Sequence, residues 1–379
     1  MKKKVKKNIL VLIFIVLLSS CSQFNNQPET ILTPDISDSL AFGRKVAISG
    51  DIALVSAVLD NYDGTHELYT GSVYVFEGGD EEWSHTQKLT ASDLADGDRF
   101  GSDIAISGTT AIIGACCANG DKLNEGAAYI FKQENGEFSQ AQKLTVSDAD
   151  TDDNFGTRVT IYGDTAAVAA PGKSSSSISG AVYIFEKSGG TWIQSQMLTV
   201  ETNENLGTSL DLSEEYLFVG SESDDLYGSV YVFEYDGDSW IQGSKISASD
   251  QGSSDLFGGD IAFSEDTLIV GAAGNDDNGA DSGSAYIYQE SSGNWSQIRN
   301  LLPDDGIDDA CFGTSVAIYS DTAVIGCAGA VYIYSQSSGT WSSTRKITNT
   351  SEHFGESTAI DESVLIVGCA ESAYIYQLD

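Results

Sequence analysis

The chain has 379 residues, of which 56 are acidic and 19 basic, and its formal net charge at pH 7 is −37. So large a negative charge repels the phosphate backbone of nucleic acids at long range, which excludes a nucleic-acid-binding protein. Only three histidines occur, His66, His85 and His353, in unrelated sequence contexts. Their scarcity argues against a histidine-based metal site or catalytic centre.

The first twenty residues predict an export signal. Five lysines within the first seven residues precede the apolar run "ILVLIFIVLL", which is too short to span a bilayer comfortably. The next word, "LSSC", resembles the lipobox of bacterial lipoproteins; the alternative is an ordinary secretory signal with an incidental cysteine. The resemblance implies that Cys21 becomes the lipidated N-terminus. Because Ser22 rather than Asp follows it, the resemblance also implies sorting to the outer membrane in a cell that has one.

A two-residue word, Phe-Gly or in one case Leu-Gly, occurs seven times. Each occurrence opens a repeat unit in which the same kinds of segment follow in the same order. An alternating stretch such as "DIAIS" follows it, then a tight polar turn such as "GTT" and an apolar run such as "AIIGA". After a loop of variable length comes a third run such as "GAAYIFK", then a Gly-containing turn, an aromatic residue and a more polar run such as "QKLTVSD". The words begin at Phe42, Phe100, Phe155, Leu206, Phe257, Phe312 and Phe354.

These units predict an all-β chain in which each unit supplies four short antiparallel strands. The first three runs of a unit are apolar on both faces, as strands buried between two neighbours require. The fourth is polar, as a solvated edge strand requires. Four-stranded units repeated about a ring form a β-propeller, so seven units predict a seven-bladed β-propeller.

The seventh unit supplies only three strands before Asp379. The segment "ETILTPDIS", Glu29–Ser37, precedes the first Phe-Gly word as "QKLTASD" precedes the second. We therefore expect this N-terminal segment to pair with Ser372–Gln377 as the fourth strand of the last blade, which removes an exposed sheet edge. The expected organisation is a lipoprotein signal peptide over 1–20, a short tether over 21–28 and the propeller over 29–379.

The repeated words resemble the FG-GAP repeat family, known from integrin α-subunit propellers and many bacterial surface proteins. The Gly-Ala-Pro word survives only in part, as "GAC" at Gly114–Cys116, "AAPG" at Ala169–Gly172 and "GAA" at Gly271–Ala273. Because the functions of this family are diverse, the resemblance implies a fold and no particular ligand.

In the integrin propellers a calcium loop lies between the first two strands of a blade. Here that connection is a tight turn, for example Ser49–Asp51, with too few carboxylates for the six or more oxygens that Ca²⁺ requires. We therefore expect no cofactor. Acidic clusters elsewhere remain calcium candidates, beside the alternative that Asp and Gly only form solvated turns. The candidates are Asp148, Asp150 and Asp152 in "DADTDDNFG" and Asp276, Asn278 and Asp281 in "GNDDNGADSG".

Strand direction predicts which loops share a face. If the Phe-Gly end of the first strand is called the top, the variable second-to-third loops and the Asp-rich connections between units all lie on top. The longest variable loops, Val58–Gly71 and Gly274–Gly283, make a lopsided pocket. We also expect Lys45, Asp103 and Arg158, each two residues after a Phe-Gly word, to meet near the channel, with Asp103 bridging the two cations.

Five cysteines follow Cys21 in the sequence, and none forms a CxxC pair with metal-site spacing. Their disulfide connectivity stays open. The aromatic residue before each fourth strand either packs the outer blade or stacks on sugar rings. The cysteines are Cys116, Cys117, Cys311, Cys327 and Cys369, and the aromatic residues are Trp83, Phe138, Trp192, Trp240, Trp295 and Trp341.

We expect a lipid-anchored binding or interaction module of the bacterial cell envelope, with an extracytoplasmic protein or glycan as its ligand. One alternative is an envelope lyase or hydrolase that uses an acidic top face. The other is a structural envelope protein without a specific ligand. Because no nucleophile elbow, phosphate loop or metal signature occurs, we do not expect an enzyme.

Overall fold

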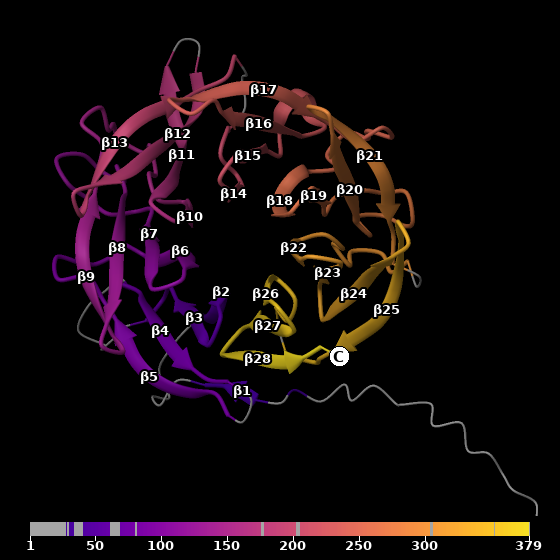
Figure 1. The fold of residues 1–379 in the computed structure, drawn as a ribbon, viewed down its shortest axis with the longest axis horizontal. Coiled ribbons are helices and arrows are strands. Elements are labelled where there is room, and N and C mark those ends of the chain that lie inside the picture. The colour runs from indigo at the N-terminus through magenta and orange to yellow at the C-terminus, as the bar shows by residue number, and fades with distance from the viewer. Residues whose placement is uncertain are drawn as a thin grey trace, which may run out of the picture.

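The computed structural model describes residues 28, 30–33, 41–60, 69–79, 82–175, 178–201, 205–303, 306–351 and 353–378. In this part of the chain, seven four-stranded antiparallel sheets surround a central channel, as Figure 1 shows in a view along that channel. The only helical element among these residues is a turn of 3-10 helix, Asp224–Leu226. The predicted all-β, seven-bladed propeller is confirmed.

Each blade begins beside the channel and ends at the rim. Blade 1 contains β2 (Phe42–Ser49), β3 (Ile52–Ala57), β4 (Ser72–Glu77) and β5 (Ser84–Leu89). Blade 2 contains β6 (Phe100–Ser107), β7 (Thr110–Ala115), β8 (Ala127–Glu134) and β9 (Glu137–Leu144). Blade 3 contains β10 (Arg158–Tyr162), β11 (Thr165–Ser175), β12 (Ile178–Ser188) and β13 (Thr191–Leu198). Blade 4 contains β14 (Leu210–Leu212), β15 (Tyr216–Ser221), β16 (Ser229–Tyr235) and β17 (Trp240–Ile246).

The remaining blades repeat this order, and the last of them takes its outer strand from the N-terminal part of the chain. Blade 5 contains β18 (Phe257–Ser264), β19 (Thr267–Ala272), β20 (Ser284–Ser291) and β21 (Asn294–Leu301). Blade 6 contains β22 (Ser315–Tyr319), β23 (Thr322–Cys327), β24 (Ala330–Ser337) and β25 (Thr340–Thr348). Blade 7 contains β26 (Ser357–Asp361), β27 (Val364–Cys369), β28 (Ser372–Gln377) and β1 (Thr30–Leu32).

Burial follows the pattern of the sequence. The strands β3 and β4 are buried along nearly their whole length, because neighbouring blades cover both faces of the sheet. The outer strand β5 instead alternates between exposed and partly buried residues until Leu89, which is buried. The propeller core therefore lies between the blades and not inside any one of them.

The ring closes as the sequence predicts. Strand β1 pairs antiparallel with β28, and Ile31 lies opposite Tyr374 while Leu32 lies opposite Ala373. Leu32 is only 1% exposed and packs in one cluster with residues of blades 1 and 7, among them Phe42 and Ile375. The two ends of the folded chain are thus joined in one sheet.

Close packing between neighbouring blades explains why glycine recurs at the same positions of each unit. The glycine of a Phe-Gly word lies against the second strand of the preceding blade, where a second glycine allows close approach. A Cβ added at Gly326 would lie 2.0 Å from the carbonyl oxygen of Gly355, and one at Gly368 would lie 2.1 Å from that of Gly43. Since no side chain fits in that space, glycine at both positions sets how closely adjacent blades pack.

Side chains also connect neighbouring blades near the rim. The amide of Gln87 in β5 donates from Nε2 to the carbonyl oxygen of Phe138 (2.7 Å) and accepts from its N–H (2.8 Å). Gln142 binds Trp192 of the next blade in the same way. These paired hydrogen bonds satisfy backbone N–H and C=O groups near the start of β9 and β13 and link each of these strands to the preceding blade.

Candidate functional site: the channel and its top mouth

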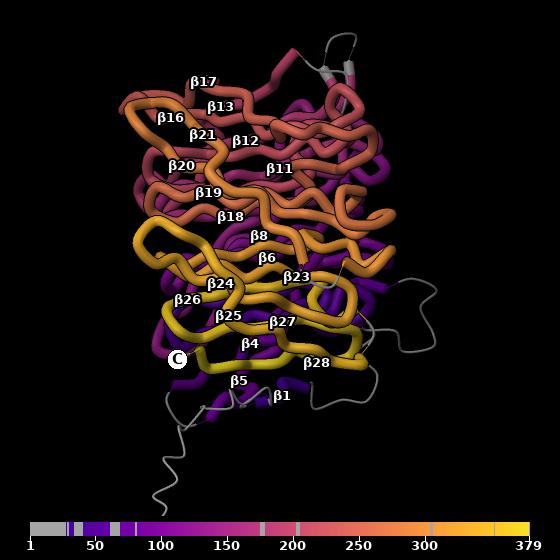
Figure 2. The backbone as a smooth tube through the Cα atoms, turned by 90° about the vertical axis from the view of Figure 1, so that its right-hand side faces the viewer, coloured from indigo at the N-terminus to yellow at the C-terminus, as the bar shows by residue number. Residues whose placement is uncertain are grey.

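The top face of the propeller, where the first strands begin, carries loops of very unequal length. Figure 2, a view at right angles to the channel, shows the strands of all blades running between two opposite faces. On the top face, fourteen residues separate β3 from β4, whereas two residues join β23 to β24 and two join β27 to β28. In blade 3, β11 and β12 extend to eleven residues each as a long hairpin, which the sequence analysis did not predict. The expected lopsided top face is present.

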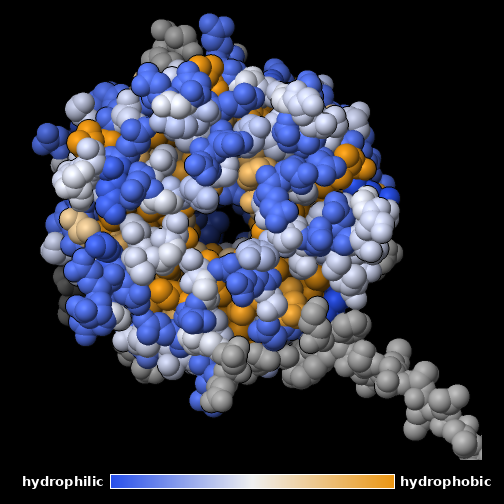
Figure 3. All heavy atoms as spheres, viewed as in Figure 1, coloured by the Kyte–Doolittle hydropathy of each residue, from blue (hydrophilic) through white to orange (hydrophobic). Residues whose placement is uncertain are grey.

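The channel is open at the centre of the disc, and hydrophilic residues are visible inside it in Figure 3. The innermost strand of every blade has no neighbouring strand on its channel side. Its N–H groups that point toward the channel therefore need other acceptors. Side chains of the preceding blade supply several of them. Asp103 accepts from the N–H of Val159 (2.8 Å), Asp260 from that of Val316 (2.7 Å), and Ser357 from that of Val46 (3.1 Å).

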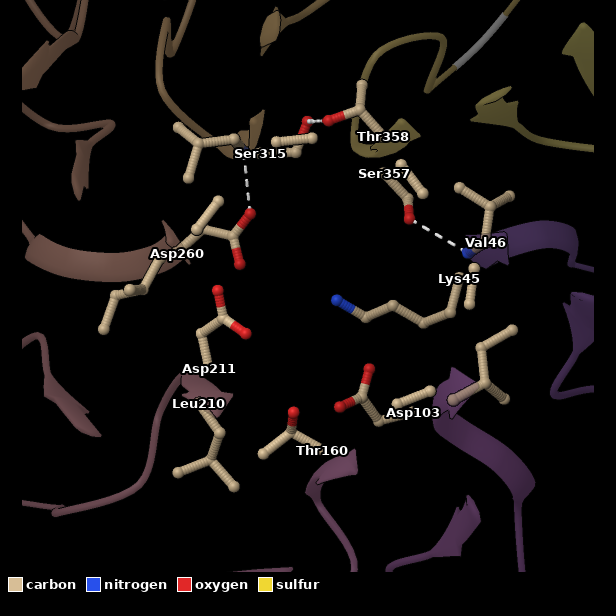
Figure 4. Close-up of a pocket in the computed structure, with 18 of the residues that line it drawn as sticks. Lys45, Val46, Asp103, Thr160, Leu210, Asp211, Asp260, Ser315, Ser357 and Thr358 are labelled. Carbon is tan, nitrogen blue, oxygen red and sulfur yellow. Dashed lines mark hydrogen bonds between the residues drawn. The ribbon is translucent and has the colours of Figure 1, made fainter. Parts of the chain in front are cut away.

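Three carboxylates from different blades line the channel, together with the extended side chain of Lys45, as Figure 4 shows. They are Asp103, Asp211 and Asp260. Burial raises the pKa of Asp211 to about 7, against the hydrogen bonds from the N–H groups of Phe263 and Leu212. Burial likewise raises the pKa of Asp260, although the charge of Lys45 opposes this shift.

The expected bridge between Lys45, Asp103 and Arg158 does not form as direct ion pairs. All three side chains line the channel, which the sequence analysis anticipated. However, within the described residues no ion pair of 4 Å or less joins Asp103 to either cation, and the Asp103 carboxylate is bound to the Val159 N–H instead. The carboxylate serves the unpaired strand edge of the next blade, a need that the sequence pattern did not reveal.

A cavity of about 530 Å³ opens at the top mouth of the channel, and four cations line it. Arg44 and Lys45 belong to blade 1 and Arg158 to blade 3, while Arg99 directly precedes blade 2. The sequence pattern predicts an acidic top face and does not single out Arg44 and Arg99. A signal was present, since both residues flank a Phe-Gly word in "FGRK" and "DRFG".

The calcium candidates in the connection between blades 2 and 3 contact other side chains of the same chain. Lys173 lies 3.3 Å from the carboxylate of Asp148, and Lys122 lies 3.2 Å from that of Asp150. Asp152 accepts a hydrogen bond from the side-chain amide of Asn124 at 2.8 Å. The three carboxylates are thus turned to three different groups.

The candidates of the fifth loop are likewise used within the loop. Asp276 accepts from the N–H of Asp281 (2.7 Å), and the amide of Asn278 donates to the carbonyl oxygen of Pro303 (2.8 Å). In the ranges that the structure describes, no group of three or more His, Cys, Asp or Glu side chains is placed to hold a metal ion.

Within the described residues, no disulfide joins any two of the five propeller cysteines. The adjacent Cys116 and Cys117 directly follow β7, with their Sγ atoms 3.3 Å apart, and Cys116 also lines the cavity at the mouth. The hydrogen bond from Cys116 lowers the pKa of the Cys117 thiol to about 7, whereas the same contact raises the pKa of Cys116. The cysteines are Cys116, Cys117, Cys311, Cys327 and Cys369.

The aromatic residues that precede the outer strands are packed into the blades. Trp192, Trp240 and Trp341 are 3 to 4% exposed, and Trp295 is half-buried against Phe218. The rings of Trp192, Trp240 and Trp341 are therefore unavailable for stacking on a sugar, and these residues confirm the packing interpretation.

Fold and repeats together define this chain as a seven-bladed β-propeller whose blades are built from one recurring unit. The chain belongs to the FG-GAP repeat family. The model of that family, described as FG-GAP repeat, matches residues 26–76, 83–131, 138–185, 240–288 and 295–339, which together make up more than half of the chain.

Solved structures with the same fold are distant in sequence. A chain of the mitotic checkpoint complex is 13% identical, with a TM-score of 0.59 over 100% of this chain and 99% of that one. Sqt1 of Saccharomyces cerevisiae is 10% identical, with a TM-score of 0.56 over 93% of this chain and 99% of that one. No curated protein matches the chain in sequence. Among the described residues, no helix is long and apolar enough to cross a membrane.

Proposed function

We propose that this protein is a lipid-anchored interaction module of the bacterial cell envelope, which holds its top face toward an extracytoplasmic protein or glycan. A β-propeller with FG-GAP repeats suggests a protein-interaction module. The finer parts of the proposal, the anchor, the location and the ligand, rest on the arguments that follow. Binding without turnover, and without a cofactor, is part of the proposal.

The observation that carries the proposal is the direction of β1. As the outer strand of blade 7, β1 runs antiparallel to β28, so it begins at the bottom face and ends at the top. A lipid on Cys21, which lies outside the described residues, would therefore pull on the bottom face. The seven residues between Cys21 and Glu29 reach about 25 Å at about 3.5 Å per residue. The bottom face would then stay near the bilayer, and the unequal top loops would face away from it.

The anchor is tested with Cys21→Ser. We expect this variant to leave the membrane fraction and to lose the mass of the lipid. An unchanged partition with no mass difference would show that Cys21 is not the point of attachment. The propeller itself should melt as the parent does, because the substitution lies outside the folded ring.

The working face is tested with a photo-crosslinking residue placed at one exposed position on each face. Leu123, in the second-to-third loop of blade 2, is 59% exposed at the top. Tyr162, the last residue of β10 in blade 3, is 48% exposed at the bottom and serves as the matched control. In intact envelopes we expect a discrete protein or glycan adduct from the top position only. Adducts from Tyr162 alone, or equally from both positions, would contradict the proposed orientation.

A further inference from the structure

The four cations at the channel mouth are unusual in a chain of this charge. The sequence has 19 Lys and Arg residues, five of which lie within the first seven residues. Four of the remaining fourteen line one cavity, and they include three of the five arginines. They come from blades 1 and 3 and from the residue just before blade 2, and Thr314 and Glu356, just before blades 6 and 7, also line the cavity. The mouth is therefore a local positive site on a strongly negative molecule.

Within the described residues, these cations form none of the ion pairs that basic residues form elsewhere in the fold. Lys88 pairs with Asp60, Lys143 with Asp93, and Lys245 with Asp224, at 2.6 to 2.8 Å. By contrast, in the described ranges none of the four mouth cations forms an ion pair of 4 Å or less. Such pairing is the rule for lysines on the outer strands but not at the mouth.

The Arg158 guanidinium lines both the channel and the cavity at its mouth. Its Nη1 donates to the carbonyl oxygen of Thr157 at 3.2 Å, while its Nε is buried without a hydrogen-bond partner among the described residues. A buried N–H of a charged group that lacks an acceptor costs free energy, which an incoming anion would recover.

The nearby carboxylates are committed to other groups. Asp103 and Asp260 accept hydrogen bonds from strand-edge N–H groups, and Glu356 lies 2.5 Å from the ring of His353. Accordingly, the like charge of Arg158 is the largest influence on Lys45 and lowers its pKa, with burial acting in the same direction. The charges of Asp103 and Asp260 act in the opposite direction, and each is a smaller influence on Lys45 than the charge of Arg158.

We propose that the channel mouth is an oxyanion site, in which Arg44, Lys45, Arg99 and Arg158 bind a compact ligand group that carries two negative charges. Guanidinium groups present fixed N–H donors that match phosphate, sulfate and carboxylate oxygens. The net charge of −37 repels an extended polyanion, so the site favours a single pendant group over a charged polymer. This inference deepens the proposed function and rests on it in one respect, since the mouth lies on the face that we propose meets the ligand.

The test is calorimetric titration of the full chain, purified in detergent, with inorganic phosphate, sulfate or malonate against a constant chloride background. Arg99→Gln and Arg158→Gln should each weaken binding about tenfold or more, because each removes charged hydrogen-bond donors. Arg299→Gln, which changes an exposed arginine on β21 away from the channel, is the matched control and should bind as the parent does. A preference for phosphate or sulfate identifies a tetrahedral ester as the natural group, whereas a preference for malonate identifies paired carboxylates.

Failure to bind any of the three anions would overturn the oxyanion site, as would equal binding by the parent and Arg99→Gln. Arg99 is exposed, so its replacement should leave the thermal melt unchanged and the comparison valid even if Arg158→Gln unfolds. The crosslinking result from Leu123 is read independently. A top-face adduct without anion binding would refute only the oxyanion site, and anion binding with a bottom-face adduct would refute only the proposed orientation.

Discussion

Leu32→Ala tests whether the short N-terminal strand holds the ring closed. Leu32 is 1% exposed and packs between blade 1 and blade 7, in a cluster that includes Val46 and Ile366. The substitution removes three carbon atoms from that interface. At about 0.8 kcal/mol for each buried carbon, the lost transfer free energy is about 2.4 kcal/mol, and the cavity left behind brings the total to about 3 kcal/mol.

The adjacent residue provides the control. Ile31 belongs to the same three-residue strand but is 53% exposed, since successive side chains of a strand point to opposite sides. Ile31→Ala should therefore change the free energy of unfolding by no more than about 0.5 kcal/mol.

Both variants are compared with the parent by urea unfolding and by thermal melting of the full chain. For a folded ring of this length, the unfolding entropy is about 0.7 kcal/mol per degree, so Leu32→Ala should lower the Tm by about 4 °C. If Leu32→Ala and Ile31→Ala behave alike, or if both leave the ring within about 1 kcal/mol of the parent, β1 does not close the propeller as argued.

Three further outcomes are expected. Gly368→Ala should destabilise the ring by about 1–3 kcal/mol in urea unfolding, because its Cβ would lie 2.1 Å from the Gly43 carbonyl oxygen, whereas Gly79→Ala, whose nearest neighbour is 3.8 Å away, should be neutral. Alkylation by iodoacetamide, followed by mass spectrometry, should label Cys117 first, with a rate that rises through pH 7, because its lowered pKa of about 7 yields thiolate there; first labelling at Cys311, whose pKa burial raises, would contradict this. A calcium chelator should leave the Tm unchanged, and a loss of more than about 10 °C would reveal a bound ion that stabilises the native state.

The fold could be predicted from the sequence because its information is local and repeated. Each unit specifies four strands by its alternation and turns, and seven repetitions of a unit that cannot bury both faces alone require a ring. The closure of the ring could also be predicted, since "ILT" matches "KLT", with Leu32 and Leu89 in the same position. The glycines that fix the blade spacing are part of the same repeated words.

The character of the site was decided only by the tertiary structure. Arg44, Arg99 and Arg158 are more than fifty residues apart from one another in the sequence, and only the radial arrangement of blades brings them to one cavity. The sequence likewise could not show that Asp103 would accept the Val159 N–H rather than neutralise Lys45. That outcome depends on the unpaired edges of the innermost strands, which exist only once the ring has closed and which compete with the cations for the same carboxylates.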